Sequence, residues 1–397
     1  MPEIDYLSQA KELKEELVRI RRDIHMHPEL GMEEHRTSAL VEAYLQSLGL
    51  ETKRVAGTGI IGIFGGVGAG KTVGLRADMD ALPLSDEKKV EYASCVPGKM
   101  HACGHDAHTA CLLVAAKLLT QYQATLPGHI KFFFQPAEET DGGALPMIEE
   151  GAMESPHVDA VFALHCDESI EAGQVGVTHG QTNAAADTFE VIIHGKSCHG
   201  AAPHEGIDAI VVVAQVINAL QSIVSRNVDP VDSVVVTIGM LRGGYKENII
   251  ADRAELSGTI RTLSPVTREI VRERVERTIK GVAGAMGASA EVRLTRGYPC
   301  LINDRSMADL VVATGKKVLG ENHVVLDSKP SLGVEDFAYF LEKAPGAFFR
   351  LGVKNEKKGI VHPAHSSLFD IDEDALPVGA AMMAQIATAY LQNSARG

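Results

Sequence analysis

The sequence predicts an α/β fold with a mostly parallel sheet, into which a ferredoxin-like α+β domain is inserted. Buried apolar runs alternate with helical segments in the first and last parts of the chain, as in parallel sheets covered by helices. The middle of the chain instead reads β-α-β-β-α-β, the order of a ferredoxin-like unit. With 397 residues, the chain is long enough for two or three domains.

The α/β part begins with an amphipathic helix over 5–23, in which Leu13, Leu17 and Ile20 share one face. A second helix over 36–48 stops at Gly49. The remaining elements alternate between helices and buried strands. We predict helices over 107–121 and 375–392, and strands over 58–64, 72–77, 129–135, 159–165 and 347–353.

The inserted part has a different sequence pattern, because its predicted strands alternate between apolar and polar residues. Ser264 and Pro265 fit the N-cap and first residue of a helix that runs to about 285. The other elements are strands over 187–194, 232–241, 252–262 and 288–295 and a helix over 206–226. We therefore predict a catalytic domain made of 1–184 and 297–397, and an inserted domain made of 185–296.

Composition excludes several classes of function. The net charge of −14 argues against a nucleic-acid partner, because phosphate contacts need a basic patch. No apolar run reaches the roughly 18 residues of a membrane span, so we expect no membrane partner. The six cysteines are scattered without a C-x-x-C pair, and the first residues do not resemble a secretion signal. These features predict a cytoplasmic protein with reduced cysteines.

Residues 65–72 read GGVGAGKT and fit the pattern of a phosphate-binding loop. Such a loop needs a strand before it and a helix after it, because the helix N-terminus holds the phosphates. The residues that follow alternate and then meet Pro83, which favours a strand and a turn. We therefore interpret this segment as a glycine-rich hairpin turn and keep nucleotide binding as a remote alternative.

Side chains that can bind metal ions lie at the ends of several predicted helices and strands. Cys103 and His105 stand two residues apart just before a helix, and thiolate with imidazole suits zinc and similar metals. Other candidates follow three buried strands, whose carboxyl ends meet at one edge of a parallel sheet. These candidates are Glu138, Glu139, His165, His362 and His365. The sequence therefore predicts a site that can hold two metal ions.

The two adjacent glutamates suggest a division of roles. Two neighbouring carboxylates do not easily bind the same ion. Glu139 can be a ligand while Glu138 takes a proton from a metal-activated water and passes it to a leaving amine. A solvated surface pair is the alternative, and the buried run FFFQPA before the pair weakens it.

The chain resembles the dinuclear metal-dependent N-acyl-amino-acid amidohydrolases, which include hippurate hydrolases, bacterial aminoacylases and plant auxin-conjugate hydrolases. The resemblance implies a catalytic α/β domain with an inserted ferredoxin-like lid, which often pairs two chains edge to edge. The matching segments span nearly the whole chain, at 21–34, 74–83, 100–110, 134–139, 189–204, 247–262, 333–338 and 365–373.

The resemblance also implies roles for single residues. It makes Glu138 the general base, with His362 as the fallback for the last metal ligand. Ser367 stands where the family usually has proline. Arg76 and Asp78 are expected beside the metals. His25 and His27 match a segment of the family, but the resemblance gives them no role in the mechanism, so we expect them to serve packing. The implied metal ligands are Cys103, His105, Glu139, His165 and His365.

In the lid, the resemblance makes His199 the residue that polarises the scissile carbonyl, often from a partner subunit. Cys198 stands where glycine is usual, which leaves the local backbone open to question. Asn248 and Arg261 match substrate-binding positions, and the fork of Arg261 suits a free carboxylate. The alternative for Arg261 is an ion pair with an acidic residue, such as Glu255 on the same strand.

Together these features predict a hydrolase that cleaves the amide bond of N-acyl amino acids, such as N-acetyl or N-benzoyl conjugates. We expect two divalent ions, zinc or manganese, although cobalt and nickel also tolerate such a mixed site. We expect a homodimer or a larger homo-oligomer through the lid domain. A carboxypeptidase or dipeptidase on the same site is the first alternative, and an inactive metal-binding homologue is another.

Overall fold

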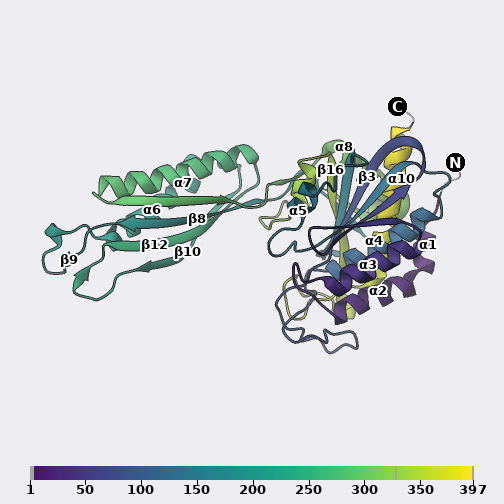
Figure 1. Ribbon diagram of the computed structural model, residues 1–397, viewed down its shortest axis with the longest axis horizontal. Helices are drawn as coiled ribbons and strands as arrows, with labels where there is room; N and C mark the ends of the chain where they lie inside the picture. The colour runs from purple at the N-terminus through teal and green to yellow at the C-terminus, as the bar shows by residue number, and fades with distance from the viewer. Residues whose placement is uncertain (1–3, 327–328, 396–397) are drawn as a thin grey trace. The chain divides into compact units, whose positions relative to one another are not determined.

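The computed structural model describes residues 4–326 and 329–395, which form two compact units (Figure 1). The first unit consists of Met1–Gly180, Ile302–Lys329 and Tyr339–Gly397, and the second of Gln181–Leu301 and Pro330–Ala338. The expected domain borders at 184/185 and 296/297 stay a prediction, and the unit borders at 180/181 and 301/302 lie within a few residues of them. The segment Pro330–Ala338, expected in the catalytic domain, belongs to the second unit.

An eight-stranded mixed sheet forms the centre of the first unit, in the order β1-β2-β4-β3-β5-β16-β6-β15. Its middle is parallel, because β3 pairs in parallel with β4 and β5, and β5 with β16. The predicted α/β class is therefore confirmed. The strands are β1 (Glu51–Val55), β2 (Gly59–Gly65), β3 (Val67–Asp78), β4 (Pro127–Gln135), β5 (Ala160–Glu171), β6 (Val175–Val177), β15 (Val324–Leu326) and β16 (Gly346–Lys354).

Helices cover this sheet and bury their apolar faces against it. The helix α4 is buried over almost its whole length, because its residues are mostly Ala, Leu and Val, and it packs against α10. The helix α10 in turn packs on β3, and α3 packs on β1 and β2. The helices are α1 (Tyr6–Glu12), α2 (Lys14–Met26), α3 (His35–Ser47), α4 (His105–Thr120), α5 (Ala144–Glu149), α8 (Arg305–Leu319), α9 (Ala338–Leu341) and α10 (Leu376–Ser394).

Three details differ from the sequence prediction or decide between alternatives. The first helical segment is divided into α1 and α2 at Leu13. The strand β5 continues past His165 to Glu171, because β16 pairs with this extension. At 65–72 the chain enters β3 and no helix follows, while Lys71 pairs with Asp159 at 2.5 Å. The geometry that phosphate binding needs is therefore absent from this segment.

The second unit has the predicted β-α-β-β-α-β order. Its four-stranded antiparallel sheet runs β10-β12-β8-β13, and α6 and α7 lie along one face of it (Figure 1). The other face carries no helix. The elements are β8 (Ala185–His194), β9 (Cys198–His199), α6 (Ala209–Asn227), β10 (Val234–Gly243), β11 (Ile249–Ile250), β12 (Arg253–Thr262), α7 (Pro265–Ala285) and β13 (Ser289–Arg296), and the short strands β7 (Gly180–Asn183) and β14 (Leu301–Asn303) lie where the chain enters and leaves the unit.

Helix ends in this unit follow the capping rules. The hydroxyl of Ser264 accepts a hydrogen bond from the Thr267 amide at 3.3 Å, and Pro265 occupies the first turn of α7 as predicted. In the described part of the chain, one helix, α6, has the length and apolar character that a membrane span needs. Its buried residues, among them Val216 and Leu220, belong to the core of the second unit.

A buried ion pair ties α7 to the sheet. The carboxylate of Asp187 on β8 accepts hydrogen bonds from Arg268 at 2.6 and 3.0 Å and lies 3.1 Å from Arg272. Burial opposes the ionisation of Asp187, but the two guanidinium groups outweigh it and lower the pKa of this carboxyl below its ordinary value. The stabilisation is therefore present at neutral pH and is lost as the pH falls from the ordinary carboxyl range towards the folded pKa.

We predict that Asp187→Ala destabilises the protein by about 3–5 kcal/mol at pH 7, because two buried guanidinium groups lose their counter-charge. Urea unfolding measures this loss, and the difference from wild type should shrink towards pH 3. The control is Glu190→Ala on the same strand, since Glu190 and Arg293 form an exposed pair 3.7 Å apart that should contribute below about 1 kcal/mol. Equal losses in the two variants would contradict the prediction.

Candidate metal centre

The sharp turn before α4 brings Cys103 and His105 to the carboxyl edge of the parallel strands. Gly104 makes this turn with a φ of 89°, a left-handed conformation that favours glycine. A Cβ atom at Gly104 would also lie 2.9 Å from the Cβ atom of Cys166. The turn can therefore approach β5 closely, and this places Cys103 Sγ 3.4 Å from His165 Nε2.

All of the predicted metal ligands converge in the first unit. Their ligand atoms form three overlapping groups in which every atom lies within 4.8 Å of the others. Among the described residues, His362 belongs to no such group, whereas His365 does. The groups are Cys103 with His105 and His165, Cys103 with Glu139 and His365, and His105 with Glu138 and Glu139.

Asp80 orients the ring of His105. The Nδ1 atom of His105 lies 2.9 Å from the Asp80 carbonyl oxygen and 3.2 Å from its Oδ1. The Nδ1 proton is thus directed at Asp80, while the buried Nε2 has no hydrogen-bond partner among the described residues. The other Asp80 oxygen accepts the Glu139 amide at 2.9 Å. Asp78 in LRADMD was the aspartate expected beside the metals, and its spacing from Asp80 was an unused signal for Asp80.

Asp78 supports the same edge through His108. The His108 Nε2 accepts the Cys166 amide at 2.8 Å, so its proton is on Nδ1 and is donated to Asp78 Oδ1 at 2.6 Å. Arg76 donates to the second Asp78 oxygen at 2.7 Å. These buried bonds fix β3, α4 and β5 to one another. Arg76 and Asp78 were expected here, but His108 was not.

The ring of His165 is oriented by its own backbone neighbour. Its Nδ1 atom donates to the Cys166 carbonyl oxygen at 2.7 Å, which leaves Nε2 facing Cys103. On the opposite side, the His365 amide donates to the Ala102 carbonyl at 2.7 Å, and His365 Nε2 lies 3.0 Å from Glu139 Oε1. His365 has a φ of 63°, so its backbone is held in an uncommon conformation at this point. Backbone contacts thus fix both histidines beside the same group of ligand atoms.

The electrostatics of this edge suit divalent cations. Burial and the neighbouring carboxylates Glu139 and Glu138 raise the pKa of the Cys103 thiol. Burial alone would lower the pKa of His105, but Asp78, Asp80 and Glu139 raise it to about 10. The carboxylates around the site thus favour an additional positive charge. Bound metal ions would supply that charge and would deprotonate the thiol.

In the second unit, the structure brings His199 and Asn248 together. Gly200 donates its amide to the Asn248 carbonyl at 2.8 Å, and β9 pairs with β11 at His199. The Nδ1 atom of His199 accepts the Ala201 amide at 3.0 Å, so the proton of the neutral ring is on the exposed Nε2. His199 can therefore donate a hydrogen bond to a carbonyl group.

Arg261 lies on the four-stranded sheet of the same unit, at the end away from β9 and β11. It pairs with Ala186 at the start of β8, whereas Arg253, eight residues earlier on β12, pairs with His194 at the end of β8. Since a strand rises about 3.3 Å per residue, Arg261 is about 26 Å along the sheet from the end that leads to His199. The acidic residue named as an example, Glu255, forms its ion pair with Arg253 at 2.7 Å instead.

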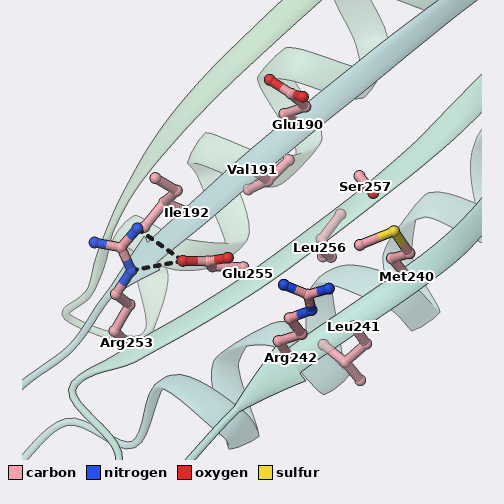
Figure 2. A pocket seen from close by; sticks show the side chains of 10 residues that line it. All are labelled: Glu190, Val191, Ile192, Met240, Leu241, Arg242, Arg253, Glu255, Leu256 and Ser257. Atoms are coloured by element: carbon pink, nitrogen blue, oxygen red, sulfur yellow. Dashed lines mark hydrogen bonds and ion pairs between the residues drawn. The ribbon is translucent and has the colours of Figure 1, made fainter.

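The helix-free face of this sheet has a hollow of 240 Å³ near its β10 edge. Figure 2 shows Arg253 and Glu255 on its floor, with Arg242 and Met240 from β10 beside them. None of the predicted site residues lines it. The backbone at Cys198 is ordinary, because Cys198 is not among the residues with a positive φ, so this position does not need the glycine that the family usually has there.

Comparisons with known proteins agree with the fold. Residues 74–389 match the model of Peptidase family M20/M25/M40. The chain is 43% identical over 386 residues to thermostable carboxypeptidase 2 of Saccharolobus solfataricus, covering 96% of this chain and 97% of that protein. It is 40% identical over 365 residues to the N-acetyl-L-cysteine deacetylase of Bacillus subtilis, covering 92% and 85%.

The fold also matches the crystal structure of the Bacillus subtilis YXEP protein, described as a dinuclear metal binding peptidase from the M20 family. The TM-score is 0.85 and the identity 34%, over 96% of this chain and 99% of that one. The chain therefore belongs to peptidase family M20/M25/M40 and is a metal-dependent hydrolase that acts on amide bonds.

Proposed function

We propose that the protein is a two-metal amidohydrolase that cleaves N-acyl amino acids to a carboxylic acid and a free amino acid. The observation that carries this proposal is the convergence of Cys103, His105, Glu139, His165 and His365, with Glu138 inside the same cluster. The relative named N-acetyl-L-cysteine deacetylase supports the substrate class. The likeness to a dinuclear peptidase supports two ions.

In this proposal Glu138 is the general base. When bound, the two ions supply Lewis-acid chemistry, which acidifies a water and polarises the scissile carbonyl. The Glu138 side chain is only 7% exposed and adjoins the ligand Glu139. Glu138 takes a proton from the attacking water as the oxygen bonds to the carbonyl carbon. It then gives that proton to the amide nitrogen as the C–N bond breaks.

The lid residues divide into two groups in this proposal. Arg261 pairs with Ala186 near the point where the chain enters the second unit, and it binds the free carboxylate of the substrate. His199 and Asn248 lie at the far end of the sheet and act on the metal centre of a partner chain. The Nε2 proton of His199 would then polarise the carbonyl.

A homodimer through the lid is part of the same proposal. The strand β10 is an edge of the sheet, and an unpaired edge is a template for another chain. Exposed apolar side chains lie on this strand and on the first turn of α6, which is the arrangement that a second copy could cover. These side chains are Met240, Leu241, Ile210 and Val211.

We further propose zinc or manganese as the native metal and the cytoplasm as the location. The mixed thiolate, imidazole and carboxylate ligand set tolerates several divalent ions, including cobalt and nickel. All six cysteines are free, which suits a reducing compartment.

A carboxypeptidase is the second candidate, and the relative named thermostable carboxypeptidase 2 favours it. Both reactions use the same ions, base and carboxylate contact, and they differ only in the group on the acyl side of the bond.

A panel of metal-reconstituted hydrolysis assays separates the two candidates. We expect N-acetyl and N-benzoyl amino acids to be cleaved with a higher kcat/KM than dipeptides that have a free amino group. Arg261→Ala should raise KM on every substrate with a free carboxylate, because the carboxylate loses a bidentate partner. Faster cleavage of dipeptides or longer peptides would replace the first candidate with the second.

The roles of the paired glutamates predict opposite signatures. Glu138→Gln should keep both metals and lose about 10²–10⁴-fold in kcat, because an amide cannot accept the proton. Glu139→Gln should lose metal, because a charged ligand becomes neutral. Metal content by elemental analysis and turnover are measured on the same samples. Loss of metal in Glu138→Gln with retention in Glu139→Gln would mean that the two roles are reversed.

The partner-chain role of His199 predicts complementation between inactive variants. Glu138→Gln and His199→Ala chains carrying different tags are co-expressed and purified together. A mixed dimer then has one site with both an intact Glu138 and an intact His199. Free mixing should restore about one quarter of the wild-type activity, because half of the dimers are mixed and each has one working site. No recovery in isolated mixed dimers would place His199 in its own chain's site.

A further inference from the structure

The segment 21–34 has no role in the function proposed above. It contains the end of α2 and the loop that leads to α3, and it lies before residue 74, where the match to the family begins. Its histidines His25 and His27 are expected to serve packing. The segment also makes polar contacts with three turns of the proposed metal centre.

At one end, Arg21 and His25 hold the carboxylate of Asp106. Arg21 Nε donates to Asp106 Oδ2 at 2.8 Å, and His25 Nδ1 lies 2.7 Å from the same oxygen. The other ring nitrogen of His25 lies 3.2 Å from Asp86 Oδ2. Asp106 directly follows the proposed ligand His105, so these bonds fix the first turn of α4.

At the other end, Glu34 holds the turn that carries the paired glutamates. The buried Glu34 carboxylate accepts the Ala137 amide at 2.8 Å and the Thr58 hydroxyl at 2.6 Å. Ala137 has a φ of 54°, which is uncommon for a residue other than glycine and persists only where surrounding contacts hold it. The next residue is Glu138.

The middle of the segment contacts the third turn. The Glu29 carbonyl accepts the Ala81 amide at 2.8 Å, and Leu30 forms a parallel bridge with Ala81. Ala81 follows Asp80, which orients His105 and accepts the Glu139 amide. Three contacts of the segment therefore fall on Asp106, Ala137 and Ala81, and each of these residues adjoins a proposed ligand, the proposed base or an orienting carboxylate. A contribution to stability alone would not require this placement.

We propose that segment 21–34 is a positioning element that holds the ligand-bearing turns in the geometry that two metal ions need, with Glu34 as its main positioning residue. This inference rests on the proposed metal centre. Groups that orient metal ligands from outside the ligand shell typically change metal affinity or activity by about 10–100-fold when they are removed. The turn at 136–139 is the most dependent on such support, because its backbone is strained at Ala137.

The test compares Glu34→Ala with Glu34→Gln in the full-length protein. The apo proteins are titrated with Co²⁺, and the visible absorption spectrum, the number of ions bound, kcat and KM are recorded. Glu34→Ala should weaken the binding of at least one ion or lower kcat by about 10–100-fold, and it should change the cobalt spectrum. Glu34→Gln should resemble wild type, because its Oε1 atom can still accept the Ala137 amide and its amide group can donate to Thr58.

Tyr6→Phe is the matched control. It removes another buried hydrogen bond of the N-terminal helices, from Tyr6 to Thr388 at 2.9 Å, which lies away from the ligands. It should lower the unfolding temperature and leave the cobalt spectrum unchanged. If Glu34→Ala does not fold, Glu34→Asp replaces it, because the shorter side chain draws the carboxylate back from the Ala137 amide.

The outcomes are distinct. A Glu34→Ala protein with wild-type cobalt binding, spectrum and kcat would overturn the inference, and so would a Glu34→Gln protein as impaired as Glu34→Ala. A wild-type protein that binds no cobalt would overturn the proposed metal centre itself.

Discussion

The concentration of carboxylates around one buried imidazole is the constraint on which the rest of the structure depends. Asp78, Asp80 and Glu139 surround His105 and raise its pKa to about 10, in a region that excludes solvent. Buried charges of one sign are tolerated only where counter-charges meet them. The parallel strands supply this arrangement, because they end at one edge and deliver acidic turns side by side. Arg76 and the proposed metal ions are the counter-charges at that edge.

The length of the strands in the second unit imposes another constraint. A ten-residue strand such as β12 is about 30 Å long, so residues at its two ends cannot contact the same small molecule in one chain. Arg261 lies near one end of β12, and the His199–Asn248 pair lies in the segments that adjoin its other end. If all three bind one substrate, two copies of the unit must contribute to each site. The proposed dimer thus follows from the geometry of this unit together with the assigned substrate roles.

The sequence predicts features that depend on local pattern. The order of the strands and helices, the cap at Ser264 and the ligands that follow buried strands all leave periodic or positional signals. Contacts between residues distant in sequence leave none, and this is why His108 was not identified. Asp80 did leave a signal, its spacing from Asp78, which was not used. The role of Glu34 was also hidden, since its partner Ala137 is 103 positions away and contributes only a backbone amide. The extension of β5 was missed because its pairing with β16 overrides a polar sequence.

The contacts of the N-terminal helices imply that metal binding and folding are linked. Arg21 pairs with Asp106 and also with Asp370 at 3.0 Å, so one buried guanidinium joins the turn after His105 to the segment after His365. Ions that bind only the folded site stabilise every element that the site requires. When the ion concentration is well above the dissociation constant, the gain in folding free energy grows with the logarithm of their ratio. The linkage is reciprocal, because a contact that orders these turns before the ions bind also raises the affinity for the ions. In the proposed metal centre, the helix α2 therefore contributes without supplying a ligand.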